Sequence, residues 1–296
     1  MTAMYSAATF VEAVQGELLE GPVWSANEQA LYVVDIVAQT LIRYRPSTDE
    51  AQKWKLPGDI GCAALRPKAG QLAVALRSGL FSFDTSTEAL EPIAPADYDV
   101  RTTRFNDGCV DRAGRLWIGT IYEPRDHPAA VLYRYDGTGP LKRMRKGFTT
   151  SNGLAFSRDG RVAYFADTPQ RKVWAFDIDD EGDLHHQRVF IDFESASLPG
   201  RPDGATIDAE GCYWLAMLDA WRIGRFDPQG KLMLQIELPV RWPTKPCFGG
   251  AELKTIFVTS LRSGRDAAQL AESPRAGTLI SIETAIAGLP ENTTRF

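Results

Sequence analysis

Short polar or glycine-rich segments recur six times along the sequence, at intervals of about 45 residues, and each comes directly before a short apolar run. The segments are Glu20-Gly21-Pro22, Gly61-Cys62, Asn106-Asp107-Gly108, Ser151-Asn152-Gly153, Pro202-Asp203-Gly204 and Pro246-Cys247-Phe248-Gly249-Gly250. A repeat of this length is typical of a β-propeller, in which each repeat folds into one antiparallel four-stranded blade. The sequence therefore predicts an all-β, six-bladed β-propeller, with each segment at the start of an inner strand.

The third repeat, residues 106–136, shows the expected strand pattern most clearly, because its short runs alternate apolar and polar residues. Turns such as 111–114 and 208–211 suit tight hairpins, since Gly tolerates positive φ and Asp bonds to its own backbone. The one candidate helix, Arg265 to Glu272, lies within an insertion in the sixth repeat. The rest of the chain is predicted to be strands and turns.

A ring of blades must also be closed, because an open strand edge invites aggregation. The segment Ala8 to Val14 alternates in polarity and is left over once the first blade is filled. We therefore expect this N-terminal strand to form the outer strand of the last blade. Six repeats account for nearly all of the 296 residues, so the interpretation is a single propeller domain spanning residues 1–296.

Composition excludes several classes of partner. Lys and Arg number 33 against 38 Asp and Glu, which gives a net charge of −5. A mildly acidic chain is poorly suited to nucleic acid or to an anionic membrane surface. The basic cluster 142–146 is interpreted as a solvated strand face. No apolar run is long enough to span a membrane, and we expect that the propeller requires no oligomer partner.

The location expected from the sequence is cytoplasmic. The first twenty residues lack the basic start and compact apolar run of a signal peptide. The four cysteines, Cys62, Cys109, Cys212 and Cys247, are far apart and form no C-x-x-C pair. We interpret them as small apolar residues that fill inner strands in a reducing compartment.

Three polar residues of the repeated segments indicate a metal site. Glu20, Asn152 and Asp203 each stand directly before a glycine at the presumed channel end of an inner strand. Two carboxylates brought together in a buried channel repel each other, and a divalent cation removes that conflict. Oxygen ligands suit Ca²⁺, Mg²⁺ or Mn²⁺, while Zn²⁺ and Fe²⁺ also accept them. We expect one divalent metal ion, with positions left open for water and substrate.

The motifs of other mechanisms are absent. The sequence contains no G-x-S-x-G, H-E-x-x-H, P-loop or G-x-G-x-x-G segment, and only three histidines. These absences argue against nucleophilic and nucleotide-dependent chemistry.

Taken in order, the repeated segments resemble the SMP-30/gluconolactonase family, also called regucalcin-like proteins. The matching stretches are Glu20 to Trp24, Arg104 to Gly108, Ser151 to Ser157, Arg201 to Gly204 and Pro246 to Gly250. The resemblance implies a cytoplasmic hydrolase of carbohydrate metabolism, a six-bladed propeller that opens sugar lactones with one divalent metal. Each stretch alone is a weak signal, but together they span nearly the whole chain.

Carried over by position, Glu20, Asn152 and Asp203 look like the metal ligands, and Arg104 and Asn106 like residues that hold the lactone. The family often has a substrate-binding Glu after the Gly-Thr strand end. Here Glu123 stands apparently one place early and before a proline, so its role as a substrate-binding residue is a weaker expectation.

The mechanism expected is attack of a metal-activated water on the metal-polarised lactone carbonyl, which yields the aldonic acid. Asp203 acts as general base in this scheme, or serves as a ligand only.

Two alternatives remain open. The same scaffold supports organophosphate or phosphotriester hydrolases. Such a site would favour an apolar pocket, whereas Arg104, Asn106 and Glu123 are polar and suit a hydroxyl-rich ligand. A non-catalytic, divalent-ion-binding propeller is the other alternative. A pure Ca²⁺ buffer would be expected to offer more than two carboxylates.

Overall fold

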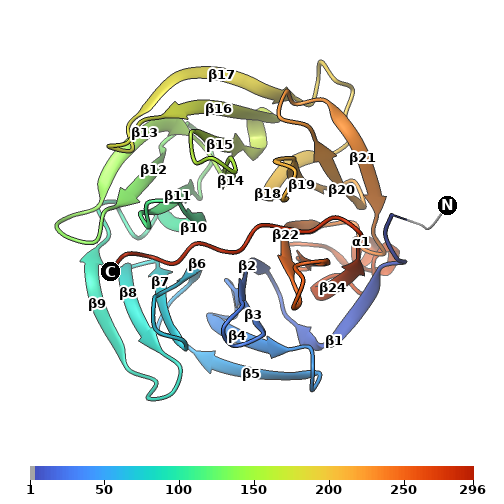
Figure 1. Ribbon diagram of the computed structural model, residues 1–296, viewed down its shortest axis with the longest axis horizontal. Coiled ribbons are helices and arrows are strands. Elements are labelled where there is room, and N and C mark those ends of the chain that lie inside the picture. The colour runs from blue at the N-terminus through green and yellow to red at the C-terminus, as the bar shows by residue number, and fades with distance from the viewer. Residues whose placement is uncertain (1–3) are drawn as a thin grey trace.

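The computed structural model describes residues 4–296 and forms six four-stranded antiparallel sheets, arranged as blades around a central axis (Figure 1). The predicted all-β, six-bladed propeller is confirmed. Each of the first five blades uses four consecutive strands, and the innermost strand of each is the first in sequence.

The strands of the blades are bounded as follows. Blade one contains β2 (Leu19–Ser25), β3 (Ala30–Asp35), β4 (Thr40–Arg45) and β5 (Glu50–Lys55). Blade two contains β6 (Ile60–Leu65), β7 (Gln71–Leu76), β8 (Gly79–Asp84) and β9 (Leu90–Pro95). Blade three contains β10 (Thr103–Val110), β11 (Leu116–Tyr122), β12 (Ala130–Tyr135) and β13 (Lys142–Phe148).

The remaining blades follow the same order. Blade four contains β14 (Ser151–Phe156), β15 (Val162–Asp167), β16 (Lys172–Ile178) and β17 (Leu184–Asp192). Blade five contains β18 (Arg201–Ile207), β19 (Tyr213–Leu218), β20 (Arg222–Phe226) and β21 (Leu232–Glu237). Blade six contains β22 (Pro243–Gly249), β23 (Thr255–Ser260), β24 (Thr278–Glu283) and the N-terminal β1 (Thr9–Gln15).

The ring is closed as predicted. Strand β1 pairs antiparallel with β24 as the outer strand of the last blade, with Phe10 opposite Ile280. The first and last parts of the described chain therefore share one sheet, which leaves no open blade in the ring.

Four of the repeated polar segments begin at the first or second residue of their inner strand, as predicted, whereas β10 and β22 begin three residues before theirs. Strand β10 already begins at Thr103, ahead of Asn106-Asp107-Gly108. In five inner strands the pairing with the second strand shifts register at the segment, as in a β-bulge, and in β22 it shifts directly before the segment. A bulge turns side chains away from the regular alternation. Near the axis, this turns polar residues into the channel.

Glycine recurs in the segments because neighbouring blades approach closely there. Gly153 has a φ of +61°, and a Cβ there would lie 2.5 Å from the hydroxyl oxygen of Tyr213. At Gly61 a Cβ would lie 2.4 Å from the carbonyl carbon of Phe105 on the next blade. Any larger residue would push adjacent blades apart.

The hairpin aspartates predicted from sequence also organise the blade interiors. Asp111 accepts a hydrogen bond from the indole of Trp117 at 2.8 Å and pairs with Arg115 at 2.6 Å. In blade five, Asp208 accepts from the indole of Trp214 at 2.8 Å. Both Trp rings are fully buried between blades. A buried indole needs such a partner, so each turn aspartate satisfies a core aromatic residue.

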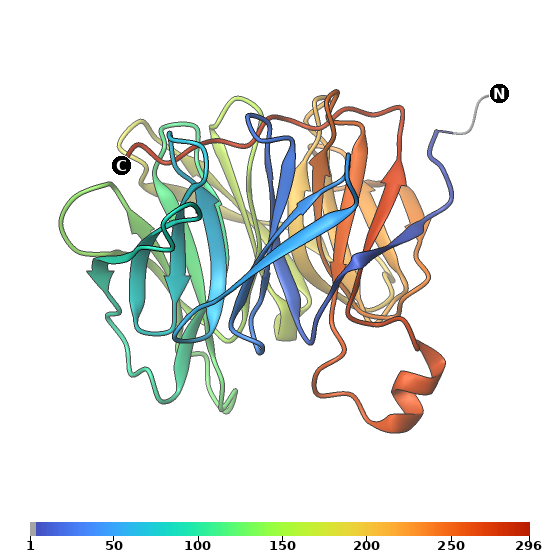
Figure 2. The same ribbon diagram turned by 90° about the horizontal axis from the view of Figure 1, so that it is seen from below.

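The two faces of the propeller differ (Figure 2). The short helix α1 (Ala267–Glu272) projects from one face, and the C-terminal segment crosses the opposite face. A 3₁₀ turn, η1 (Thr168–Gln170), follows β15. Helix α1 confirms the helix predicted at Arg265 to Glu272, although it begins two residues later, at Ala267. None of the helices formed by residues 4–296 has the length and apolar character needed to cross a membrane.

Two smaller predictions have mixed outcomes. The basic cluster 142–146 lies on the outer strand β13 and is largely solvated, as predicted. Cys62, Cys109 and Cys247 lie on inner strands, whereas Cys212 directly precedes the second strand β19 and does not belong to an inner strand. All four are free thiols.

Candidate active site at one end of the axial channel

Five of the six predicted site residues line one pocket at the channel end on the α1 face. The pocket has a volume of about 130 Å³ and is lined by Glu20, Arg104, Asn106, Asn152 and Asp203, among others. They come from the inner strands of blades one, three, four and five. Residues spread over nearly two hundred positions therefore meet in space.

A chain of hydrogen bonds fixes the two amide side chains of this pocket. Arg104 Nη1 donates to Asn106 Oδ1 at 2.7 Å, and Asn106 Nδ2 donates to Asn152 Oδ1 at 2.8 Å. Asn152 Nδ2 donates in turn to Thr168 Oγ1 at 2.8 Å, and that hydroxyl donates to the carbonyl of Pro202. Because Thr168 already donates elsewhere, it can only accept from Asn152, which fixes the amide with Oδ1 toward the channel.

The two carboxylates are buried with little compensation. Glu20 has an exposed fraction of 6% and Asp203 of 4%. Burial raises the pKa of Glu20 to about 7, and the negative charge of Asp107 adds to the rise, against the opposing effects of the Gly21 N–H, Lys245 and Arg104. Burial likewise raises the pKa of Asp203 well above its usual value, with Glu20 and Asp107 contributing. A positive ion between them would remove this cost.

The chemistry of the pocket fits a hard divalent cation. Residues 4–296 contain no cluster of three or more His, Cys, Asp or Glu side chains suited to a metal, so any cation here needs the amide oxygen of Asn152 beside the two carboxylates. That oxygen accepts one hydrogen bond and keeps a second lone pair. Thr150 Oγ1, which also lines the pocket, is buried and lacks a hydrogen-bond partner in the described protein. Such an oxygen suits a bound water or substrate hydroxyl.

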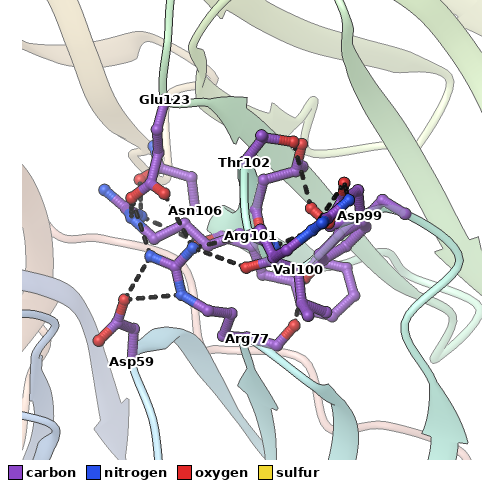
Figure 3. Close-up of polar contacts among 12 residues, drawn as sticks. Asp59, Arg77, Asp99, Val100, Arg101, Thr102, Asn106 and Glu123 are labelled. Carbon is purple, nitrogen blue, oxygen red and sulfur yellow. Dashed lines mark hydrogen bonds and ion pairs between the residues drawn. The ribbon is translucent and has the colours of Figure 1, made fainter.

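Glu123, the sixth predicted residue, does not line this pocket. Its carboxylate binds Arg77 through two hydrogen bonds of 2.8 Å each, and Arg77 also binds Asp59 at 2.6 Å (Figure 3). Arg104 Nε lies 3.5 Å from Glu123 Oε1. Glu123 therefore lies within ion-pair distance of Arg104 but is not among the residues that line the pocket.

Sequence reasoning missed several pocket residues. Thr168 holds Asn152, and Thr244 Oγ1 donates to the carbonyl of Leu19, beside Glu20, at 2.6 Å. Nothing in the sequence singles out these threonines, because their role depends on contacts between blades. Arg201 stands next to Pro202-Asp203, where its position beside a repeated segment could have marked it. Arg125 and Arg265 come from loops.

The fold and the channel geometry identify the class of protein as a propeller with one polar site on its axis, and comparison with known proteins gives the family. Residues 18–262 match the family model described as SMP-30/Gluconolactonase/LRE-like region. The chain belongs to this family, as its repeated segments predicted.

Individual relatives cover almost the whole chain. The chain is 39% identical over 272 residues to a 6-deoxy-6-sulfogluconolactonase of Pseudomonas putida, which covers 92% of this chain and 93% of that protein. It is 33% identical to regucalcin of Oryctolagus cuniculus, covering 92% of each. A crystal structure of a calcium-binding protein, regucalcin, from Agrobacterium tumefaciens superposes with a TM-score of 0.92 at 26% identity, over 98% of both chains. The enzyme class expected from sequence, a lactone hydrolase, agrees with the name of the first.

Proposed function

We propose that the protein hydrolyses a sugar lactone to the corresponding aldonic acid, with one divalent cation held by Glu20, Asn152 and Asp203. The observation that carries this proposal is the convergence of these three oxygen ligands with Arg104 and Asn106 in one pocket. Membership of a family whose relatives include a named gluconolactonase supports the same reaction.

A divalent cation bound at these ligands supplies Lewis acidity, which polarises an ester carbonyl and makes a neighbouring water more acidic. The residues of the chain provide the rest. Asp203 is buried in the pocket beside the other proposed ligands, so its carboxylate is placed to accept the proton of the attacking water. Arg104 and Asn106 are hydrogen-bonded at 2.7 Å. The remaining N–H groups of Arg104 offer donors to the hydroxyls of the sugar ring. Asn106 offers Oδ1 as an acceptor, because its Nδ2 already donates to Ser151 and Asn152. A fixed ring orientation brings the carbonyl to the attacking water.

Hydrolysis follows a simple balance of bonds. The water oxygen bonds to the carbonyl carbon, the bond from that carbon to the ring oxygen breaks, and the ring oxygen leaves as a hydroxyl. The proton taken up at Asp203 is available to that leaving oxygen. The product is an open-chain aldonic acid, and no further co-reactant is needed.

The experiment that tests the proposal combines a panel of sugar lactones with a panel of metals. After exhaustive chelation we expect no hydrolysis above the spontaneous rate, and restored activity with at least one of Ca²⁺, Mg²⁺, Mn²⁺, Zn²⁺ or Fe²⁺. Hydrolysis at full rate by the chelated protein would overturn the metal site. Absence of hydrolysis with every lactone and metal would overturn the enzymatic function.

A second candidate is divalent-ion binding without catalysis, because the Agrobacterium tumefaciens relative is described as a calcium-binding protein. The same experiment separates the two functions. Calcium binding measured by calorimetry, with every lactone left intact, would support the ion-binding function alone.

A further inference from the structure

The pocket at the α1 face carries more positive charge than its metal site requires. Besides Arg104, its lining includes Arg125, Arg201 and Arg265, against the two carboxylates Glu20 and Asp203. A divalent cation would balance those two carboxylates. The chain as a whole has a net charge of −5, so arginines gathered at this one mouth are a local exception.

The partners of these arginines divide them into two groups. Arg104 is bound to Asn106 and lies near Glu123, and Arg201 forms two hydrogen bonds to Asp219, at 3.0 and 2.6 Å. In the chain from residue 4 to 296, neither Arg125 nor Arg265 forms an ion pair, and neither side chain forms a hydrogen bond. The Nε atom of Arg265 is buried and has no acceptor.

Arg265 is nevertheless held firmly in place. Its guanidinium lies 5.0 Å from the ring centroid of Trp242, a fully buried residue whose indole donates to Asp219 at 3.0 Å. The next residue, Asp266, caps helix α1 through a reciprocal pair of hydrogen bonds with Gln269. The insertion in the sixth repeat therefore places at the pocket a guanidinium whose Nε has no acceptor in the described chain.

The cations also affect one another. Partial burial lowers the pKa of Arg265, and the nearby charges of Arg201, Arg241 and Arg125 lower it further, while Asp219 opposes them. Gathering like charges costs free energy, which an anion bound between them would recover. Clusters with unmet charge of this kind are typical of binding sites.

We propose that the lactone carries an oxyanion substituent, such as a sulfonate, phosphate or carboxylate group, and that Arg125 and Arg265 bind it. Guanidinium groups match these oxyanions because two N–H donors of one plane reach two oxygens at once. The lactone carbonyl faces Glu20, Asn152 and Asp203, and the charged group at the far end of the sugar faces the loops that carry Arg125 and Arg265. This inference rests on the proposed lactonase activity and names its substrate class.

The test compares four matched lactones: neutral D-glucono-1,5-lactone and its analogues with a sulfonate, a phosphate or a carboxylate at carbon six. In the wild-type protein we expect kcat/KM to be about tenfold or more higher for at least one anionic lactone than for the neutral one. The anionic group whose lactone gives the highest kcat/KM is the one that the site prefers. We expect this ratio to fall as ionic strength rises, because salt screens charge pairs.

Variants then assign the preference to residues. Arg265→Gln and Arg125→Gln should each lower the anionic-to-neutral ratio of kcat/KM by about tenfold, mainly through KM. Arg241→Gln is the matched control, since Arg241 also lies over Trp242, at 5.6 Å, but binds Glu272 and does not line the pocket. Its ratio should equal that of the wild type.

Each outcome decides between the two proposals. A neutral lactone hydrolysed as well as all anionic ones, with no effect of salt, overturns the oxyanion site and leaves the lactonase activity standing. The salt measurement needs no variant, so it applies even if a substituted protein fails to fold. No hydrolysis of any of the four lactones counts against the lactonase activity itself.

Discussion

At the α1 end of the axial channel, residues just before the strand bulges line the candidate active site. At the opposite end, residues just after the bulges line a second cavity of about 280 Å³. The C-terminal segment lies over this second cavity, and we call this the tail-covered end. Thr244 and Lys245 illustrate the division, because these neighbours line different cavities. Five of the six inner strands therefore supply both ends, and β6 lines only the second cavity.

The two ends differ in how their charges are neutralised. At the tail-covered end, Lys245 Nζ lies 2.5 Å from Asp107 Oδ1, and Asp107 also accepts the backbone N–H of Leu154. At the other end, Glu20 and Asp203 form no ion pair with any residue of the described chain. Lys245 and Asp107 thus neutralise each other within the protein, whereas Glu20 and Asp203 have no such partner among the described residues. We interpret the tail-covered end as structural and the α1 end as the candidate binding end.

The C-terminal segment adds to that contrast. Asn292 donates to the carbonyl of Val110 at 3.0 Å, and the backbone N–H of Thr294 donates to Leu65 at 2.8 Å. The segment crosses the middle of the propeller in Figure 1 and is bound to inner strands of two blades. We interpret it as a cover for the structural end, which leaves the α1 end for substrate.

The largest effect should come from neutralising a carboxylate at the binding end. Glu20→Gln or Asp203→Asn is expected to lower kcat/KM for a lactone by about 10³-fold or more, because loss of a charged ligand removes both metal affinity and charge stabilisation. The measurement is lactone hydrolysis at saturating metal, beside calorimetric metal titration. Glu291→Gln at the tail-covered end is the matched control, and its activity should stay within about twofold. Equal losses at both ends would contradict the distinction drawn here.

The next effect concerns stability at the structural end. Lys245→Met leaves the buried carboxylate of Asp107 unpaired, and removal of one partner from a buried ion pair costs about 3–5 kcal/mol. We expect the free energy of unfolding in urea to fall by that amount. The double variant Lys245→Met, Asp107→Asn should recover part of the loss. A double variant less stable by the sum of the single effects would show that the two residues act independently.

A third prediction concerns pH at the binding end in the absence of metal. The pKa of Glu20 is raised to about 7 in the folded protein, from 4.5 for an ordinary Glu. The folded state therefore binds the proton more tightly than the unfolded state, so its contribution to stability is fully present below about pH 4.5 and is lost as the pH rises through about 7. Each pKa unit corresponds to about 1.4 kcal/mol.

Saturating divalent metal should abolish this loss, since a bound cation stabilises the ionised carboxylates. The check is the free energy of unfolding from pH 4.5 to 8, with and without chelator, and with Glu20→Gln as the control that removes the titrating group. Identical pH profiles with and without metal would show that no cation binds near Glu20.

Much of this architecture could be predicted from the sequence, because the polar segments recur at a fixed interval and each corresponds to one bulge of an inner strand. The convergence of Glu20, Asn152 and Asp203 followed from their equivalent places in the repeat. The closing strand followed from an alternating segment, Ala8 to Val14, that no other blade required.

What could not be predicted depends on contacts between blades. Thr168, which holds Asn152, is itself fixed by the carbonyl of Pro202 on the next blade. Lys245 reaches Asp107 across the channel, at a separation of 138 residues. The sixth segment, Pro246 to Gly250, contains no charged residue, whereas Lys245 directly before it pairs with Asp107 in the channel. The contact of Glu123 with Arg77 was also not predicted, because the side-chain direction of a loop residue has no periodic signal. Its role at the substrate stays a prediction.

The smallest effect should appear at the cover of the structural end. Asn292→Ala removes the hydrogen bond to the carbonyl of Val110, which should cost about 1 kcal/mol of unfolding free energy. We expect lactone kcat/KM and metal affinity to stay unchanged, because the affected contact lies on the far side of the Asp107–Lys245 pair. Thr168→Val provides the comparison at the binding end, where loss of the hydroxyl that orients Asn152 should weaken metal binding by about 10–100-fold. If Asn292→Ala weakened metal binding as much as Thr168→Val, the two ends would be coupled and the C-terminal segment would be part of the site.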